Sequence, residues 1–397
     1  MPDSNILQRI YFDYAATTPV HPSVHKAMNP YFNRLFGNPS AVHYHGRKAR
    51  QAMDSAREKV ARLIGAEGEC LFFTSGGTEA NNLAISGIAF ANRKKGNHII
   101  TSVIEHHAVL EVCHSLEDSG FEVTYLPVDK SGMVSPDDVE KAITDKTIVI
   151  SVMLANNVIG TIQPIAEIGK IAHEKGIYLH TDAVQAIGHI PISVNSLGVD
   201  MLSISAHKLY GPKGIGALYI RKGTRIAPII YGGGQENRMR SGTENVPGIV
   251  GFGRAAELAR EDIKQENEQL IRLRDLLIKS VLTNVPYSHL NGHPTKRLPN
   301  NTNFSFEFIE GEWLCSRLDD RGISASTGSA CSSSSHEPSY VLKAIGRPPE
   351  LCHGSLRLTL GKWTTDEEID RVLNVLPEVI ANIRSSSLLY KKHIEHA

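Results

Sequence analysis

Polar and ionisable residues follow a series of apolar runs in the first half of the chain. In sequence order they are Ser75-Gly76-Gly77-Thr78, Glu105-His106-His107, Asn156-Asn157, Asp182 with Gln185, and Ser205 followed by His207-Lys208. Short apolar runs indicate buried strands, and ligands bind at the carboxyl ends of parallel strands. We therefore expect a glycine-rich turn, an imidazole, amides, a carboxylate and an amine along one edge of a sheet.

These groups match the requirements of pyridoxal 5'-phosphate. Its phosphate needs backbone N–H groups and hydroxyls at a helix N-terminus, which Gly77 and Thr78 would supply. The cofactor also needs a lysine for its Schiff base and an acid beside the pyridine nitrogen, and Lys208 and Asp182 have those properties. Taken singly, such a glycine turn is more often only a tight turn, and Asp182 is equally well explained as a helix N-cap. Their combination predicts a pyridoxal-phosphate site.

Further candidates would act on a substrate. His106 could stack on the cofactor ring or move protons near neutral pH, although a lone histidine is usually structural. Arg357 could clamp a carboxylate or form an ordinary ion pair. Cys331 lies in the Ser/Gly-rich segment 322–339, whose composition favours a mobile loop and a reactive, exposed thiol. Lys213, the competing lysine, is better explained as part of a solvated turn.

The elements that would position these residues follow from hydrophobic periodicity. Strands are expected at 70–74, 98–104, 121–126, 147–154, 177–181, 201–205 and 215–220, and helices near 77–94, 107–118, 135–143 and 164–175. Such alternation predicts an α/β fold with a mostly parallel sheet covered on both faces. A helix across 49–64 precedes it. A long helix from about 253 to 281 leads to a smaller C-terminal domain that ends in a helix near 366–384.

Composition narrows the class of protein. The 397 residues suffice for about two to three domains, and 42 basic residues balance 42 acidic ones, so neither direct nucleic-acid binding nor an anionic membrane partner is expected. The N-terminus lacks the pattern of a secretory signal, and we find no apolar stretch of about 20 residues. Five scattered cysteines do not suggest a disulfide framework. We expect a cytoplasmic protein without a metal site, with Cys352-His353 a remote metal candidate.

Nine motifs, in the same order along nearly the whole chain, resemble those of cysteine desulfurases. The resemblance is to the NifS/IscS-like branch of class V, fold-type I pyridoxal-phosphate enzymes. The motifs are DYAATTP at 13–19, GNPSAVH at 37–43, FTSGGTEAN at 73–81, EHHAV at 105–109, HTDAVQ at 180–185, SISAHKLYGPKGIG at 203–216, RSGTENV at 240–246, TGSACS at 327–332 and SLRLTLG at 355–361.

The resemblance implies a fold and a set of site residues. The fold would comprise a large domain at 15–260, with a mostly parallel seven-stranded sheet flanked by helices, and a small α+β domain from 1–14 and 261–397 that carries the Cys331 loop. Lys208 would hold pyridoxal phosphate, Asp182 would pair with its ring nitrogen and Gln185 with its hydroxyl, and His106 would stack on the ring and assist proton transfer. The phosphate would be bound by Gly77, Thr78, Ser205, His207 and, from a second subunit, Thr243. Asn157 would contact the cofactor and, with Arg357, the substrate carboxylate.

The resemblance also implies a reaction and partners. L-cysteine would give L-alanine and a persulfide on Cys331, and a homodimer would pass that sulfur to acceptor or scaffold proteins for iron–sulfur cluster assembly, tRNA thiolation or DNA phosphorothioation. Alternatives are a lyase on cysteine, cystine or selenocysteine, or a class V aminotransferase, which do not need Cys331, and a catalytically inactive scaffold subunit. The chain departs from the family at Val158, which replaces a usual glutamate, and at Leu154, which replaces a frequent histidine.

Overall fold

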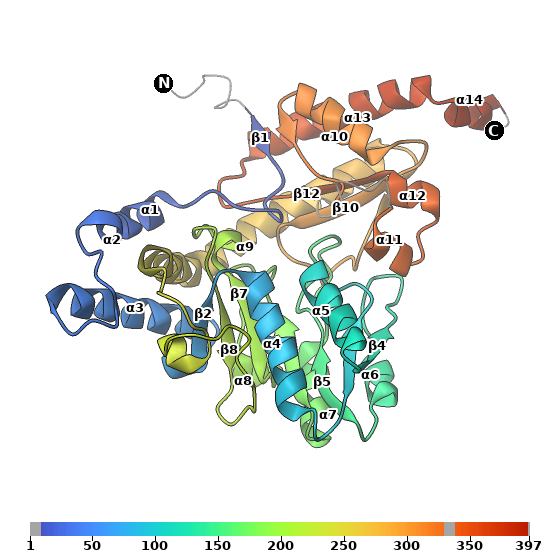
Figure 1. Ribbon diagram of the computed structural model, residues 1–397. Helices are drawn as coiled ribbons and strands as arrows, with labels where there is room; N and C mark the ends of the chain where they lie inside the picture. The colour runs from blue at the N-terminus through green and yellow to red at the C-terminus, as the bar shows by residue number, and fades with distance from the viewer. Residues whose placement is uncertain (1–8, 329–337, 396–397) are drawn as a thin grey trace.

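A seven-stranded sheet forms the centre of the larger part of the protein (Figure 1). The computed structural model describes residues 9–328 and 338–395. The sheet has the order β2-β8-β7-β6-β5-β3-β4, in which β8 is antiparallel to both neighbours and the remaining neighbouring pairs are parallel. Its strands are β2 (Leu71–Thr74), β3 (His98–Ser102), β4 (Glu122–Leu126), β5 (Thr147–Ser151), β6 (Tyr178–Asp182), β7 (Met201–Ser205) and β8 (Gly216–Ile220).

The seven predicted strands and the mostly parallel sheet are confirmed. The boundaries differ at the carboxyl ends, where the functional candidates lie. Strands β3 and β5 end at Ser102 and Ser151, before the predicted positions 104 and 154, because the apolar run continues into the buried connections beyond each strand. Asp182 is the last residue of β6, whereas we expected it to follow the strand.

Helices cover both faces of this sheet. On one face, α4 (Gly77–Asn92) and α5 (His107–Asp118) share an apolar core with strand residues such as Met201. On the other, the next residue, Leu202, packs in a core built from α3 (Tyr44–Leu63), α6 (Pro136–Ala142), α7 (Ile165–Glu174) and the first part of α9 (Val246–Asn284). Successive strand residues point to opposite faces, so a continuous apolar run fills both cores.

A second, smaller unit lies above the carboxyl edge of the sheet (Figure 1). It contains an antiparallel sheet of order β12-β10-β9, formed by β9 (Ser288–Leu290), β10 (Asn301–Phe306) and β12 (Ser355–Thr359), with α10 (Gly311–Asp320) and α13 (Asp366–Ser386). Strand β10 was not predicted because most of its buried residues are polar. Asn291 explains how they are buried: its Nδ2 donates to Asn303 Oδ1 and Ser305 Oγ at 2.7 and 2.8 Å.

The long helix α9 connects the two units. It begins at Val246, earlier than the predicted 253, because Asn245 caps it by accepting from Gly248 N at 3.1 Å and Pro247 is tolerated in the first turn. Ile249 and Phe252 pack in the large core, whereas Leu273 and Leu277 pack in the small one. This change of core along one helix supports our proposed domain division at residues 260 and 261.

The Ser/Gly-rich segment 322–339 begins with a short strand. Ile323–Ser324 form strand β11, which pairs in parallel with β1 (Ile10–Tyr11), and Ser326 bridges Arg357. The expectation of an irregular segment throughout 322–339 is therefore wrong at its start. A two-residue strand whose partner lies at the other end of the chain leaves no local periodicity to detect.

The remaining elements have eight residues or fewer. They are α1 (Pro22–Met28), α2 (Pro30–Asn33), η2 (Gly68–Cys70), α8 (Val194–Leu197), η3 (Ala206–Lys208), η4 (Gln235–Arg238), α11 (Tyr340–Ala344), α12 (Pro349–His353) and α14 (Leu388–Glu395). Across the described residues, none of the helices combines the length and the apolar character that crossing a membrane requires.

Candidate active site

A cavity of about 280 Å³ lies at the carboxyl edge of the large sheet, beneath the small unit. This volume lies just below the range of about 300 to 1,000 Å³ that is typical of ligand pockets, so it suits a small ligand. Ten of the predicted site residues line it: Gly77, Thr78, His106, Asn157, Asp182, Gln185, Ser205, His207, Lys208 and Arg357. Thr243 is exposed and does not line the cavity, and Cys331 lies outside the described residues.

The glycine turn between β2 and α4 opens a helix N-terminus toward the cavity. Gly76 is the N-cap of α4 and makes no side-chain capping bond, so the first N–H groups of the helix are left for other acceptors. A Cβ on Gly77 would lie 2.7 Å from Val184 Cγ2, which explains why glycine is needed there. Such a turn suits a phosphate, because backbone N–H groups and the helix dipole both favour an anion.

Two donors orient the carboxylate of Asp182. Asn81 Nδ2 donates to Oδ2 at 2.7 Å, and Val184 N donates to Oδ1 at 2.9 Å. Asn81 is 1% exposed and also lines the cavity, but sequence reasoning missed it. Its position three residues after Thr78 on the same helix was the available signal, since residues at that spacing share one helix face.

The N-terminal segment 13–18 lies across the catalytic candidates that follow β7. Lys208 Nζ donates to Ala15 O at 2.5 Å and to Ala16 O at 2.7 Å, and Gln185 Nε2 donates to Ala15 O at 2.9 Å. Nδ1 of His207 lies 3.1 Å from Oγ1 of Thr17. Burial, followed by the nearby lysines, lowers the pKa of His207 to about 4, so this ring is neutral at physiological pH.

His106 is held in one orientation by its own helix. It is the N-cap of α5, and its Nδ1 accepts from Ala108 N at 3.0 Å. Because a backbone N–H can only donate, the proton of the neutral ring must be on Nε2. Burial lowers the pKa of His106, an effect that Asp182 opposes and Lys208 reinforces. The ring therefore carries its proton on Nε2 at neutral pH.

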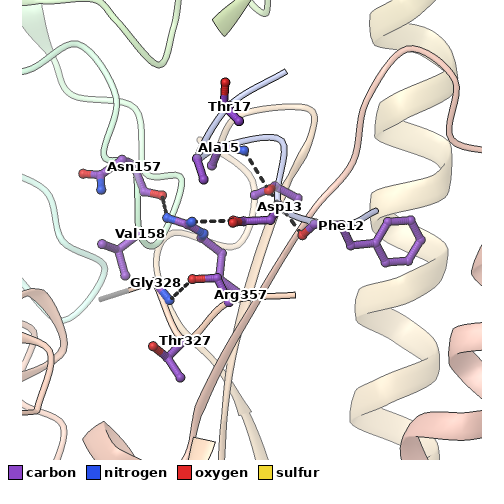
Figure 2. A network of polar contacts seen from close by, with 12 residues as sticks. Phe12, Asp13, Ala15, Thr17, Asn157, Val158, Thr327, Gly328 and Arg357 are labelled. Carbon is purple, nitrogen blue, oxygen red and sulfur yellow. Dashed lines mark hydrogen bonds and ion pairs between the residues drawn. The ribbon is translucent and has the colours of Figure 1, made fainter. Parts of the chain in front are cut away.

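Arg357 reaches the cavity from the small unit. Its side chain lies between Asp13 and Asn157, as Figure 2 shows, and donates to Asp13 Oδ1 and to the Asn157 backbone oxygen. Among the described residues, Arg357 Nε and Asn157 Oδ1 are buried without a hydrogen-bond partner. Unsatisfied buried polar atoms are costly, so their position beside the cavity indicates a place for a polar ligand.

Val158 and Leu154 replace the usual family residues with buried apolar side chains. Val158 packs in a small core with Ile104, Ile159 and Val341, and a Cβ on Gly328 would lie 3.0 Å from Val158 Cγ1. Leu154 belongs to the core of the large unit. A glutamate at position 158 would place a charge in this apolar core, a cost that valine avoids.

Glu105 is a buried acid whose importance sequence reasoning missed. Ser102 Oγ and Met153 N donate to its Oε1 at 2.6 and 3.0 Å, and among the described residues Oε2 has no partner. Burial raises the pKa of Glu105 to about 8, so the carboxyl group is mostly protonated at neutral pH. The sequence shows that Glu105 precedes a histidine pair, but its protonation depends on burial by the chain around β3 and β5.

Replacing Glu105 with glutamine is expected to remove a pH dependence of stability. Because the folded-state pKa is raised, the protonated acid contributes stability that is present below about pH 4.5 and lost as the pH rises toward about 8. The neutral amide has no such loss. The difference in the free energy of unfolding between variant and parent should therefore shift in favour of Glu105→Gln by a few kcal/mol, as an order of magnitude, between pH 5 and 8.

Urea denaturation at both pH values measures this shift. The exposed Glu174 at the end of α7 provides the matched control, because Glu174→Gln changes the same residue type on a solvated surface. Parallel stability curves for Glu105→Gln and the parent would show that Glu105 is ionised in the folded protein.

The described cysteines are poor nucleophiles, and the Cys352-His353 pair is not part of a metal-binding group. Cys70, Cys113 and Cys352 are buried and Cys315 is partly buried. Burial raises the pKa of each thiol, to about 12 for Cys113 and Cys315, which disfavours the nucleophilic thiolate. Within residues 9–328 and 338–395, no group of three or more His, Cys, Asp or Glu side chains is arranged to hold a metal ion, and this includes Cys352-His353.

Known proteins are similar to this chain in sequence and in fold. The class-V aminotransferase family model matches residues 10–372. Cysteine desulfurase IscS of Methanosarcina thermophila is 60% identical over 383 residues, which cover 96% of this chain and 95% of that protein. Cysteine desulfurase IscS of Dictyoglomus turgidum is 58% identical over 380 residues, or 96% of each chain.

Solved structures agree with this assignment. A NifS-like protein superposes with a TM-score of 0.89 at 40% identity and covers 94% of this chain and 100% of its own. SspA in complex with cysteine superposes with a TM-score of 0.79 at 39% identity and covers 90% of this chain and 100% of its own. The α/β fold is that of fold-type I enzymes, and the chain belongs to the class-V aminotransferase family, within its cysteine desulfurases.

Proposed function

We propose that this cysteine desulfurase uses pyridoxal phosphate to convert L-cysteine to L-alanine and transfers the sulfur to Cys331 as a persulfide. The observation that carries the proposal is the convergence of Lys208, Asp182 and Arg357 on one small cavity, although they come from distant parts of the chain. When bound, pyridoxal phosphate supplies an electron sink for the electron pair left when a proton leaves the substrate Cα.

The cavity contains a suitable group for each part of the cofactor. Gly77 and Thr78 at the start of α4, with Ser205 and His207, would bind the phosphate. Asp182, oriented by Asn81, would face the pyridine nitrogen and keep it protonated. Gln185 would contact the ring hydroxyl. Asn157 Oδ1, buried without a partner among the described residues, would gain one from the bound molecule.

The substrate would be held and deprotonated by residues around the same cavity. Arg357 would bind its carboxylate together with Asn157. Lys208 Nζ would hold the cofactor at rest and, as a free amine, would remove the proton from the substrate Cα. His106 would stack on the ring and present its Nε2–H as a proton donor, since Nδ1 is already occupied by Ala108 N.

Sulfur transfer requires a nucleophile that the other cysteines do not provide. The Cys331 thiolate would attack the substrate Sγ, forming an S–S bond while the substrate Cβ–Sγ bond breaks. The electron pair of that bond stays with the carbon skeleton, which takes up protons and leaves as L-alanine. A free thiol has a reference pKa of about 8.5, so Cys331 must lose a proton to a neighbouring base before it attacks.

We further propose a homodimer in which Thr243 contributes to the phosphate site of the other subunit. Thr243 is exposed and outside the cavity of its own chain, as this arrangement requires. Large exposed apolar side chains from α2 to the first residue of α3, those of Phe32, Phe36, Val42 and Tyr44, offer a surface for the second subunit. A monomeric mass in analytical ultracentrifugation would exclude this assembly.

The persulfide would be passed to sulfur-acceptor or scaffold proteins in a reducing cytoplasm. Iron–sulfur cluster assembly, tRNA thiolation and DNA phosphorothioation are all chemically compatible destinations. The relatives named cysteine desulfurase, and the structure of SspA in complex with cysteine, support cysteine as the source of that sulfur. Incubating the persulfidated protein with each acceptor and following the sulfur by mass spectrometry would identify the pathway.

Product stoichiometry tests the reaction. With L-cysteine and a reductant, the purified holoenzyme should release alanine and sulfide in equal amounts. Equal amounts are expected because one sulfur leaves for each carbon skeleton that is reprotonated. Pyruvate with ammonia would instead indicate a lyase, and conversion of the cofactor to its aminated form would indicate an aminotransferase. A preparation that binds no cofactor and releases no product would support a scaffold subunit.

A further inference from the structure

We propose that Asp13 is a positioning residue that fixes the guanidinium of Arg357 for recognition of the substrate carboxylate. The inference rests on the proposed function of Arg357. It assigns a task to the N-terminal motif at 13–19, which the resemblance leaves without one. Asp13 would thereby determine the preference for amino acids over amines that lack a carboxylate.

The guanidinium is held from two sides. Its Nη2 donates to Asp13 Oδ1 at 2.7 Å, and its Nη1 donates to the Asn157 backbone oxygen at 3.0 Å (Figure 2). A guanidinium has five N–H donors in a rigid plane, so two bonds to different amino groups fix the direction of the remaining three. Arg357 lines the cavity, and its Nε has no partner among the described residues.

Asp13 is itself rigidly placed. Its backbone oxygen accepts from Tyr11 Oη at 3.0 Å and from Ala16 N at 2.9 Å, and its backbone forms a bridge with Thr359 on β12. Phe12, the preceding residue, is fully buried in the core of the small unit, and its oxygen accepts from Thr359 N at 2.8 Å. The carboxylate therefore moves with the strand that carries Arg357.

Burial makes the ion pair an effective constraint. The side chain of Arg357 is 3% exposed and that of Asp13 is 19% exposed, so water competes weakly for the guanidinium. Truncating one partner of a buried pair leaves the other charge uncompensated and free to seek a different partner. Without Asp13, Arg357 would turn away from the geometry that receives a carboxylate, and binding would lose a preorganised contact.

The same segment also contacts the cofactor side of the cavity. Lys208 and Gln185 donate to Ala15 O, two residues after Asp13. The segment thus sets the distance between the proposed carboxylate clamp and the amine that would hold the cofactor.

The test compares L-cysteine with cysteamine, its analogue without a carboxylate, in the holoenzyme. The Kd of each is measured from the change in cofactor absorbance for the parent, Asp13→Ala and Asp13→Asn. We expect Asp13→Ala to bind L-cysteine about tenfold more weakly and cysteamine as the parent does. Asp13→Asn, which retains a hydrogen-bond acceptor, should stay within about threefold of the parent for both. The rate at saturating L-cysteine should change by less than about threefold in either variant.

Arg357→Ala is the reference variant that distinguishes an error in the role proposed for Arg357 from an error in the role proposed for Asp13. If Arg357→Ala keeps the parental preference for L-cysteine over cysteamine, the proposed role of Arg357 is wrong. If Arg357→Ala loses the preference and Asp13→Ala keeps it, only the role of Asp13 is wrong. Equal weakening of both ligands in Asp13→Ala would show a structural role and overturn the proposal.

Asp13→Glu tests position separately from charge and serves if Asp13→Ala does not yield folded holoenzyme. It keeps the carboxylate but displaces it by one methylene. We expect it to weaken L-cysteine binding at least about threefold while cysteamine binding is unchanged. Unchanged L-cysteine binding in Asp13→Glu would contradict a positioning role.

Discussion

Replacing Lys208 with alanine should abolish turnover of L-cysteine, by at least about 10⁴-fold, because its amine is proposed both to attach the cofactor and to remove the Cα proton. Lys208 is the lysine that lines the cavity, and Ala15 O and Ala16 O aim its Nζ there. Reduction with borohydride followed by mass spectrometry measures the attachment. The parent chain should gain the mass of the reduced cofactor on Lys208, and the variant should gain none.

Lys213 supplies the matched control. It is exposed in the turn that follows, and its Nζ lies 3.5 Å from Thr18 O. Lys213→Ala should therefore retain the borohydride-stable adduct and most of the activity. Activity in Lys208→Ala, or transfer of the adduct to another lysine, would contradict the assignment of the Schiff base.

Replacing Cys331 with alanine has the second largest expected effect. The variant should lose persulfide formation and cysteine-dependent alanine production, by at least about 10³-fold, because no other thiol would receive the sulfur. The cofactor should remain bound and coloured, since the residues proposed to hold it are unchanged. Persulfide is measured by mass spectrometry after one turnover, and alanine is measured in the same sample.

Cys315→Ala provides the control for the loss of a thiol from the small unit. Burial raises the pKa of Cys315 to about 12, so this thiol is protonated and should be dispensable. Normal alanine release by Cys331→Ala would mean that another group accepts the sulfur or that the enzyme is a lyase. Loss of cofactor colour in Cys331→Ala would show that the residue supports the fold of the site.

Local patterns in the sequence were sufficient to predict the large sheet and most of the residues on the cofactor side of the cavity. Apolar runs of strand length, separated by helical periodicity, predicted the seven strands in their positions. Since ligands bind where parallel strands end, the polar residues after these runs could be assigned to one site from their order along the chain. Gly77, His106, Asp182 and Lys208 line the same cavity for that reason.

The small unit was predicted less completely because its strands are short or partly polar. Strand β10 buries asparagine and serine side chains that bond to Asn291, and β11 has only two residues. Neither leaves the alternation of apolar and polar residues by which strands are recognised. Helix α9 was predicted, but it begins at Val246 and not near residue 253, because Pro247 occupies the first turn, where proline is permitted.

Contacts between distant residues were decided by the tertiary structure alone. The sequence determined the types of the catalytic candidates and their order along one sheet edge. It did not determine that Asp13 pairs with Arg357 across 344 residues, that Asn81 orients Asp182 across 101, or that Glu105 is buried and protonated. Periodicity reports only which face of its own element a residue occupies. Side-chain partners and local burial depend on how elements from opposite ends of the chain pack together.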